Sequence, residues 1–189
     1  MPHGASRSGI VTLSRCRVES ALRRSLPVET GFSKFLDLDR CYSVSRVPVS
    51  NGRELCLYNV HLSAYTTDGS IATEQLAMLL EDMEEEYRSG NYVICGGDFN
   101  KDLLGDSGSI FGVSGEAYTW AQPFPKELVP EGISLTAPLD EEHPIPSRRN
   151  ADKAYDPETS FVLTVDGFLV SDNVEVTGAQ VVDTGFAWS

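Results

Sequence analysis

Long apolar runs are missing from the sequence, and none approaches the roughly 20 residues that a helix needs to cross a bilayer. The opening segment, Met1 to Ser8, also lacks the apolar core of a secretory signal. Both absences predict a soluble chain. The compartment stays open, because a segment upstream of this sequence can carry a signal of its own.

Cysteine is scarce, with 4 residues, and no two of them form a Cys-x-x-Cys pair. This spacing argues against a zinc site or a redox-active dithiol. The even number permits two disulfides, but a chain of 189 residues can bury enough apolar surface to fold without them. We interpret the cysteines as small core residues and expect Cys56 and Cys95 to be buried thiols.

Basic residues are also few, since 15 Lys and Arg stand against 28 Asp and Glu and give a net charge of -13. The resulting negative field repels polyanions and argues against tight, sequence-independent binding of duplex nucleic acid. The length fits one ordinary domain, and 41% hydrophobic residues are typical of a folded globular chain.

The first third of the chain is rich in β-forming residues. Residues 8–14 predict a strand that begins close to Met1. Residues 40–49 and 53–61 predict an antiparallel pair, because Asn51-Gly52 between them supplies the positive φ angles of a tight hairpin turn.

Residues 70–89 predict an amphipathic helix, because apolar side chains recur at steps of three and four residues. We expect the acidic run 81–86 to face water, with a docking surface for a basic partner as the alternative. Gly90 is expected to end the helix.

The remaining segments predict short strands and long loops. Residues 92–95 are continuously apolar, which is typical of a strand buried on both faces. Residues 101–158 are rich in Gly, Pro and Ser and predict functional loops. Residues 161–170 and 174–183 predict two late strands around a turn at 171–173. Several strands with one helix indicate an α+β fold.

Polar residues gather where the predicted strands end. Alternation places Asn59 and His61 on one face of their strand, although a lone histidine there is often structural. After residues 92–95, Gly96-Gly97 lets the chain turn so that Asp98 and Asn100 project to one side. Their carboxylate and amide oxygens suit a hard cation such as Mg²⁺, and an Asx-type turn is the alternative.

An EF-hand begins well at Asp98, but Leu103 stands where that loop needs Gly and Ser109 where it needs Glu, so we reject it. Asp166 lies inside an apolar strand and needs a partner, for which a histidine is the natural candidate. In the loop region, Arg148, Arg149 and Asn150 are candidates to contact phosphate, a solvated loop being the alternative.

Three of these segments occur in a specific order and spacing: Asn59-Val60-His61-Leu62, Gly97-Asp98-Phe99-Asn100 and Val165-Asp166-Gly167-Phe168-Leu169-Val170-Ser171. Residues 9–15, Gly-Ile-Val-Thr-Leu-Ser-Arg, support them. Together they resemble the endonuclease/exonuclease/phosphatase superfamily, which includes pancreatic-type deoxyribonuclease and inositol polyphosphate 5-phosphatases. The resemblance covers nearly the whole chain.

The resemblance implies an α+β fold that is part of a four-layer α/β/β/α sandwich of the deoxyribonuclease I type. It implies a metal-dependent hydrolase of phosphoesters that uses in-line attack of water, with Mg²⁺ as the cofactor and Mn²⁺ or Ca²⁺ as alternatives. The implied catalytic residues are His61, Asp98, Asn100 and Asp166, of which Asp98 and Asn100 also bind the metal. The implied substrate contacts are Asn59, Arg149 and Asn150.

Two departures from the family pattern concern the ends of the chain. The family's metal-binding Glu belongs upstream of residues 9–15, and its closing Ser-Asp-His belongs after Ser189. We therefore expect residues 1–189 to form a single partial domain, truncated at both ends and inactive or crippled alone. The alternative is a non-catalytic binding module on the same fold.

The expected partner is a phosphoester substrate. The acidic balance favours a small molecule or a lipid head group over a long nucleic acid. Self-association is also expected, because a partial domain leaves sheet edges uncovered.

Overall fold

A hairpin at the Asn51-Gly52 turn forms part of the main sheet, and the sequence predicts this hairpin. It joins β2 (Cys41–Pro48) to β3 (Glu54–His61), which pair antiparallel. Gly52 adopts a φ of 81°, and the Asn51 side chain accepts a hydrogen bond from the Arg53 N–H at 3.1 Å. The predicted hairpin is therefore confirmed, together with the role of its turn residues.

Helix α1 (Ser70–Arg88) follows β3 and returns the chain to the start of β4 (Tyr92–Asp98). Because the helix runs back along the sheet, β4 pairs parallel with β3. Gly90, with a φ of 83°, ends the helix as expected, and its N–H donates to the Tyr87 carbonyl at 2.8 Å.

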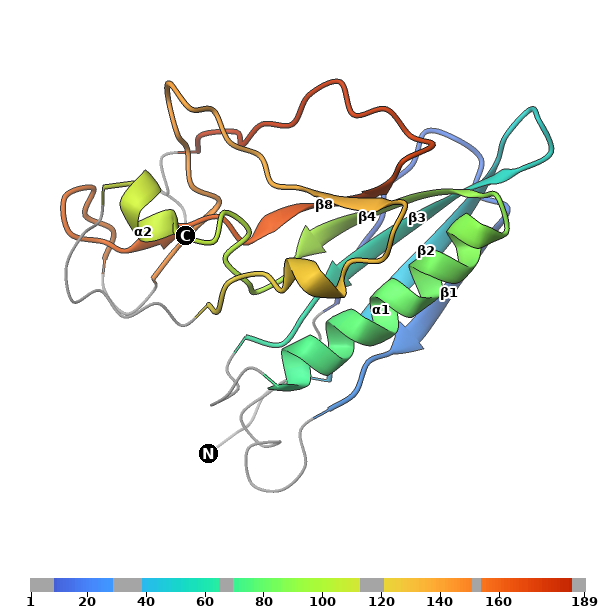
Figure 1. Ribbon diagram of the computed structural model, residues 1–189, viewed down its shortest axis with the longest axis horizontal. Helices are drawn as coiled ribbons and strands as arrows, with labels where there is room; N and C mark the ends of the chain where they lie inside the picture. Colours follow the sequence, from blue (N-terminus) through green and yellow to red (C-terminus); the bar gives the residue numbers. More distant parts are fainter. Residues whose placement is uncertain (1–8, 29–38, 65–69, 113–120, 151–153, 185–189) are drawn as a thin grey trace, which may run out of the picture.

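The structure is a computed structural model that describes residues 9–28, 39–64, 70–112, 121–150 and 154–184. Its six-stranded sheet has the order β1-β2-β3-β4-β8-β5, with α1 lying along one face (Figure 1). The strands not yet given are β1 (Ser20–Ser25), β5 (Ile133–Thr136) and β8 (Asp166–Ser171). Both β5 and β8 are antiparallel to their neighbours.

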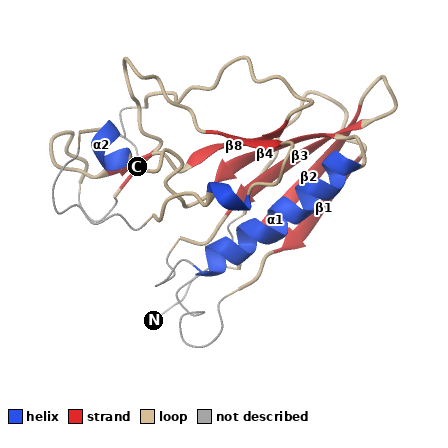
Figure 2. Cartoon of the chain, viewed as in Figure 1, coloured by secondary structure: helices blue, strands red, loops and turns tan. Residues whose placement is uncertain are grey.

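The smaller elements all lie between β4 and β8 in the chain, and the helix α2 (Ser107–Ile110) is placed beyond the carboxyl end of β4 (Figure 2). The others are the 3-10 helix η2 (Lys126–Leu128) and a two-stranded sheet of β6 (Arg148–Arg149) and β7 (Val162–Leu163). Residues 101–158 are mostly loop, as predicted, although β5 within them was not foreseen. No described helix is both long and apolar enough to cross a membrane.

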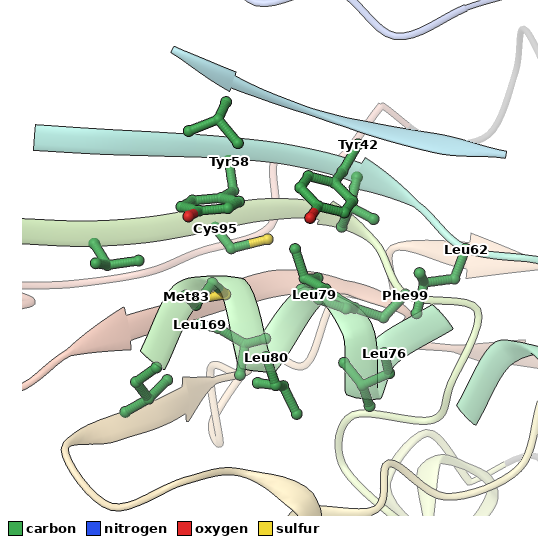
Figure 3. Packing of buried hydrophobic residues seen from close by; sticks show 14 of the residues in the cluster. Tyr42, Tyr58, Leu62, Leu76, Leu79, Leu80, Met83, Cys95, Phe99 and Leu169 are labelled. Carbon is green, nitrogen blue, oxygen red and sulfur yellow. The ribbon is translucent and has the colours of Figure 1, made fainter. Parts of the chain in front are cut away.

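The core fills the space between the sheet and α1 (Figure 3). From the sheet come Tyr42, Tyr58 and Cys95, and from the helix come Leu79 and Met83, each at most 4% exposed. The apolar stripe read from the sequence therefore faces the sheet. Buried thiols at Cys56 and Cys95 were predicted, and both cysteines are free and buried.

The other face of the sheet is less covered. Phe168 on β8 is 41% exposed on that face, and in the segment before β1 Leu13 is 91% exposed. Over this face, the Asn59 side-chain amide donates a hydrogen bond to the Val11 carbonyl at 3.0 Å. The described residues thus supply one helix layer and one main sheet, which fits part of a four-layer sandwich.

Three predictions about strands are wrong in the described residues. Residues 9–14 form no strand; the edge strand is β1, whose six residues are all exposed. Residues 174–183 also form no strand. Residues 92–95 are a strand, but only Val93 and Cys95 are buried, because Tyr92 and Ile94 face the less covered side.

The expectation that the acidic run 81–86 faces water is wrong for two of its carboxylates. Asp82 is buried. Asp82 accepts a hydrogen bond from the Tyr42 hydroxyl at 2.8 Å. Glu86 pairs with the Arg46 guanidinium on β2. Burial alone would raise the pKa of Glu86, but the hydrogen bonds from Arg46 and Asn91 outweigh it and lower that pKa.

Candidate active site

Three polar side chains form one row across three neighbouring strands. His61 pairs with Asp98 across β3 and β4, and Asp98 pairs with Asp166 across β4 and β8. Paired residues project to the same side of a sheet. Since Val60, next to His61, is buried on the helix-covered face, the row lies on the face opposite α1.

Gly97 lets β4 run unusually close to β3 just before the row. A Cβ atom at this position would lie 2.0 Å from the Val60 carbonyl oxygen, and the φ of 153° is also unfavourable for other residues. The strands remain joined beyond Gly97, since the Leu62 N–H donates to the Asp98 carbonyl at 3.0 Å. Asp98 is therefore fixed by backbone contacts at the last position of its strand.

Asp98 uses both carboxylate oxygens. Its Oδ2 lies 3.5 Å from His61 Nε2, and its Oδ1 accepts the Asn100 N–H at 2.8 Å. The second contact is the Asx-type turn that the sequence offered as an alternative to a metal site. The turn and a ligand-binding role are compatible, because a carboxylate has several lone pairs.

Asn100 closes the turn from a left-handed conformation, with a φ of 47°. Its side-chain amide donates to the Leu62 carbonyl at 2.6 Å, which ties the loop after β4 to the end of β3. The side chain is buried, at 6% exposure. Its amide oxygen is the atom with which Asn100 can reach a ligand.

The two carboxylates of the row are held in poorly hydrated surroundings. Burial raises the pKa of Asp98, while the Asn100 N–H and the charges of Arg148 and Arg40 oppose that rise. Burial also raises the pKa of Asp166, and the Asp98 charge raises it further, against Ser147, Arg148 and His61. A cation beside the pair would relieve this repulsion.

Ser147 supports the start of β8 and was not predicted from the sequence. Its hydroxyl accepts the Val165 N–H at 3.1 Å and the Asp166 N–H at 3.2 Å. The sequence predicted a histidine as partner of Asp166. In the described part of the chain, Ser147 is the group hydrogen-bonded at this residue, and His61 contributes its charge from β3. A serine in a Pro-rich loop carries no signal that would have identified it.

The three predicted substrate contacts each make structural contacts. Arg149 is 9% exposed, donates to the Asn150 carbonyl at 2.8 Å and lies over the Tyr155 ring. The Asn150 N–H donates to the Phe161 carbonyl at 2.9 Å, and Asn59 holds Val11 as described above. By contrast, Arg148 is exposed and lies toward the row. The substrate-binding role of Asn59, Arg149 and Asn150 stays a prediction.

Within the described ranges, no group of three or more His, Cys, Asp or Glu side chains is arranged to hold a metal ion. Asp98 and Asp166 are two charged oxygen donors at paired positions of the row. Mg²⁺ commonly takes one or two carboxylates and keeps several waters, so two carboxylates and an amide fit its habits.

The fold is similar to that of several solved structures. It matches ANGEL2, a 2′,3′-cyclic phosphatase, with 16% identity and a TM-score of 0.50, over 82% of this chain and 55% of that one. An endonuclease/exonuclease/phosphatase family protein from Bacteroides thetaiotaomicron matches with 16% identity and a TM-score of 0.49, over 82% and 51%. The human Nocturnin catalytic domain matches with 17% identity and a TM-score of 0.46, over 82% and 48%.

The chain has the endonuclease/exonuclease/phosphatase fold. The likeness to ANGEL2 carries this conclusion. No protein-family model matches the sequence, and the curated proteins contain no match to it. The resemblance read from the three sequence segments is thereby confirmed at the level of fold.

The chain spans about half the length of the solved chains that it matches. In the endonuclease/exonuclease/phosphatase fold described here, the row of His61, Asp98 and Asp166 lies on the less covered face of the sheet. The three sequence segments that carried the resemblance are the ones that supply this row. Whether its members act in catalysis is a question of function rather than of fold.

Proposed function

We propose that this chain supplies the main-sheet part of the active site of a phosphoester hydrolase. The observation that supports the proposal is the row of His61, Asp98 and Asp166 at the ends of three strands. Buried, mutually repelling carboxylates are costly to a fold, and such arrangements gather at functional sites. The known activity of ANGEL2 as a cyclic phosphatase agrees with this reaction class.

We further propose that the hydrolase depends on Mg²⁺. Asp98 and Asp166 would hold the ion with the help of the Asn100 amide oxygen, and Mn²⁺ or Ca²⁺ are alternatives. The fit rests on the oxygen-only donor set and on the raised pKa of both carboxyl groups, which a neighbouring cation would lower. When bound, the ion would polarise a phosphoryl oxygen and neutralise developing charge.

Each residue of the row would have a separate role in the reaction. Asp98 would orient the attacking water for in-line displacement, because its carboxylate is fixed by the Asn100 N–H. His61, half-exposed beside it, would donate a hydrogen bond to a phosphoryl or leaving oxygen. Asp166 would hold His61 and the metal site in place through its charge.

A binding module without catalysis is the second candidate. It is favoured by the lack, in the part of the chain that the structure describes, of any three-residue metal group. Such a module would bind a phosphoester at the same row and leave it intact. The two candidates differ in turnover, so an assay of hydrolysis separates them.

The test compares this chain with a longer protein that contains it, using a panel of nucleotides, phospholipid head groups and sugar phosphates. We expect hydrolysis that requires Mg²⁺ and stops with EDTA, and weak or no turnover by the 189-residue chain alone. Asp98→Ala should lower kcat/KM at least about 100-fold. Glu81→Ala, which removes an exposed carboxylate on α1, is the control. Equal activity of the Asp98→Ala and control variants would refute the proposal.

A further inference from the structure

Arg148 is placed beside the row by backbone contacts on both of its sides. The preceding residue, Ser147, accepts hydrogen bonds from the Val165 and Asp166 N–H groups. Arg148 itself pairs with Leu163 in the short sheet of β6 and β7. The position of residue 148 relative to the start of β8 is thus set by two strands and a side-chain hydroxyl.

The two adjacent arginines of β6 have opposite environments. Arg149 is buried and engaged by Asn150 and Tyr155. Arg148 is exposed, and among the described residues its guanidinium makes no hydrogen bond or ion pair. A guanidinium readily forms ion pairs with carboxylates. Because Arg148 forms no ion pair with Asp98 or Asp166, its N–H donors are available to a ligand.

Arg148 is nevertheless close enough to act on both carboxylates. Burial raises the pKa of Asp98 and of Asp166, and the Arg148 charge opposes that rise at both. His61 also lies near both carboxylates, with its Nε2 3.5 Å from Asp98 Oδ2, whereas Arg40 acts on Asp98. The geometry agrees, since the residue before Arg148 is hydrogen-bonded to the Asp166 N–H and Asp166 pairs with Asp98 across β8 and β4.

We propose that Arg148 binds the phosphate of the substrate, donating two hydrogen bonds to non-bridging phosphoryl oxygens held against Asp98 and Asp166. The inference rests on the proposed function and names the residue that recognises the anion. A phosphate that approaches two carboxylates in a chain of net charge -13 meets repulsion, and a fixed cation offsets it. The planar fork of a guanidinium matches two phosphate oxygens, which an ammonium group cannot do.

The geometry assigns this role to Arg148 in place of Arg149. The exposed side chain can reach a bound anion without breaking any contact within the described residues. Arg149 would first have to leave Tyr155 and the Asn150 carbonyl. The ligand class is a phosphoryl group, either on a small ester or as free phosphate.

Inorganic phosphate is the probe, titrated calorimetrically with and without Mg²⁺ into the 189-residue chain. Arg148→Gln should weaken phosphate binding at least about tenfold, since a hydrogen bond to a charged group is lost. Arg148→Lys keeps the positive charge but loses the planar pair of donors. Its phosphate affinity should lie between that of the unchanged chain and that of Arg148→Gln. Arg88→Gln removes an exposed arginine on α1 and should bind as the unchanged chain does. Matching thermal unfolding curves show that each variant is folded.

The outcomes separate this inference from the proposed function. An unchanged phosphate affinity in folded Arg148→Gln overturns the inference about Arg148. Failure of the chain to bind phosphate at millimolar concentration also overturns that inference. Phosphate binding that depends on Arg148, with no hydrolysis in any longer protein, supports the inference while the proposed function fails. In an active longer protein, an unchanged KM for Arg148→Gln would overturn the inference and leave the hydrolase standing.

Discussion

Asp98 and Asp166 occupy paired positions on β4 and β8, so two carboxylates stand side by side on one face of the sheet. The Asp98 side chain is 18% exposed, and burial raises the pKa of both residues. The fold places two like charges where water screens them poorly. This arrangement costs stability, and the proposed binding of a cation or a phosphate would offset that cost.

Replacing Asp166 by Asn should stabilise the protein at neutral pH. The folded-state pKa of Asp166 is raised above its ordinary value of 3.8, so the folded state holds this proton more tightly than the unfolded state does. Its contribution to stability is therefore fully present below that value and is lost as pH rises through the folded pKa. We expect Asp166→Asn to raise the free energy of unfolding at neutral pH by about 1 kcal/mol.

Urea unfolding in EDTA at neutral and acid pH measures this effect. The gain of Asp166→Asn should shrink in acid, where the carboxyl group of the original protein is protonated. Glu81→Gln, at an exposed position on α1, should change little at either pH. A gain of equal size at both pH values would mean that packing, and not charge, causes it.

Gly97→Ala should destabilise the fold strongly. The added Cβ would meet the Val60 carbonyl oxygen at 2.0 Å, and backbone cannot move aside as a side chain does. We expect a loss of at least about 2 kcal/mol in thermal or urea unfolding. Gly96→Ala is the matched control, because its Cβ would meet the Phe168 ring at 3.1 Å and that ring is 41% exposed and free to shift. Similar losses for the two variants would contradict the close approach of β3 and β4.

Local signals explain what the sequence predicted correctly. The Asn51-Gly52 turn, the apolar period of α1 and the Gly-rich turn before Asp98 each act within a few residues, so the hairpin, the helix and the loop after β4 could be read directly. Edge strands lack such signals. β1 is an exposed, mostly polar stretch whose extended form depends on pairing with β2, whereas the β-branched residues 9–14 find no partner strand in the described structure.

The sequence names the members of the row but not how they are aligned, and their role in a site stays a prediction. His61, Asp98 and Asp166 were named from strand ends, but their alignment depends on the register of β3, β4 and β8, which no single segment encodes. The support from Ser147 arises across 19 residues, and the exposure of Arg148 beside a buried Arg149 follows from the pairing of β6 with β7. These features depend on tertiary structure, so no local sequence signal predicts them.

Gln75 holds the segment that follows His61, and its loss should be costly. Its side chain is fully buried; it donates to the Pro27 carbonyl at 2.7 Å and to the Ser63 hydroxyl at 3.0 Å, and it accepts the Ser63 N–H at 2.9 Å. Gln75→Ala leaves these buried groups unpaired and should cost about 2 kcal/mol by urea unfolding. Glu74→Ala, one residue earlier and exposed, should cost less than about 0.5 kcal/mol. If the two costs are equal, the hydrogen bonds of Gln75 do not stabilise the fold.

The four cysteines should differ in reactivity according to burial. Cys16 is exposed and Cys41 half-buried, whereas Cys56 and Cys95 are buried, and all four are free. Burial, aided by the charge of Glu86, raises the pKa of Cys56 to about 12, and burial alone raises the pKa of Cys95. Because the thiolate is the reactive form, neither should react with a disulfide reagent at neutral pH in the folded protein.

Titration with such a reagent should therefore give one fast thiol, one slower thiol, and two that react only after unfolding in urea. Cys16→Ser should remove the fast phase and leave the others unchanged. Rapid labelling of Cys95 in the folded protein would mean that the sheet opens beneath α1 on the timescale of the assay, because its thiol is fully buried between sheet and helix. The core that positions Asp98, three residues further along β4, would then be less rigid than the row of paired side chains requires.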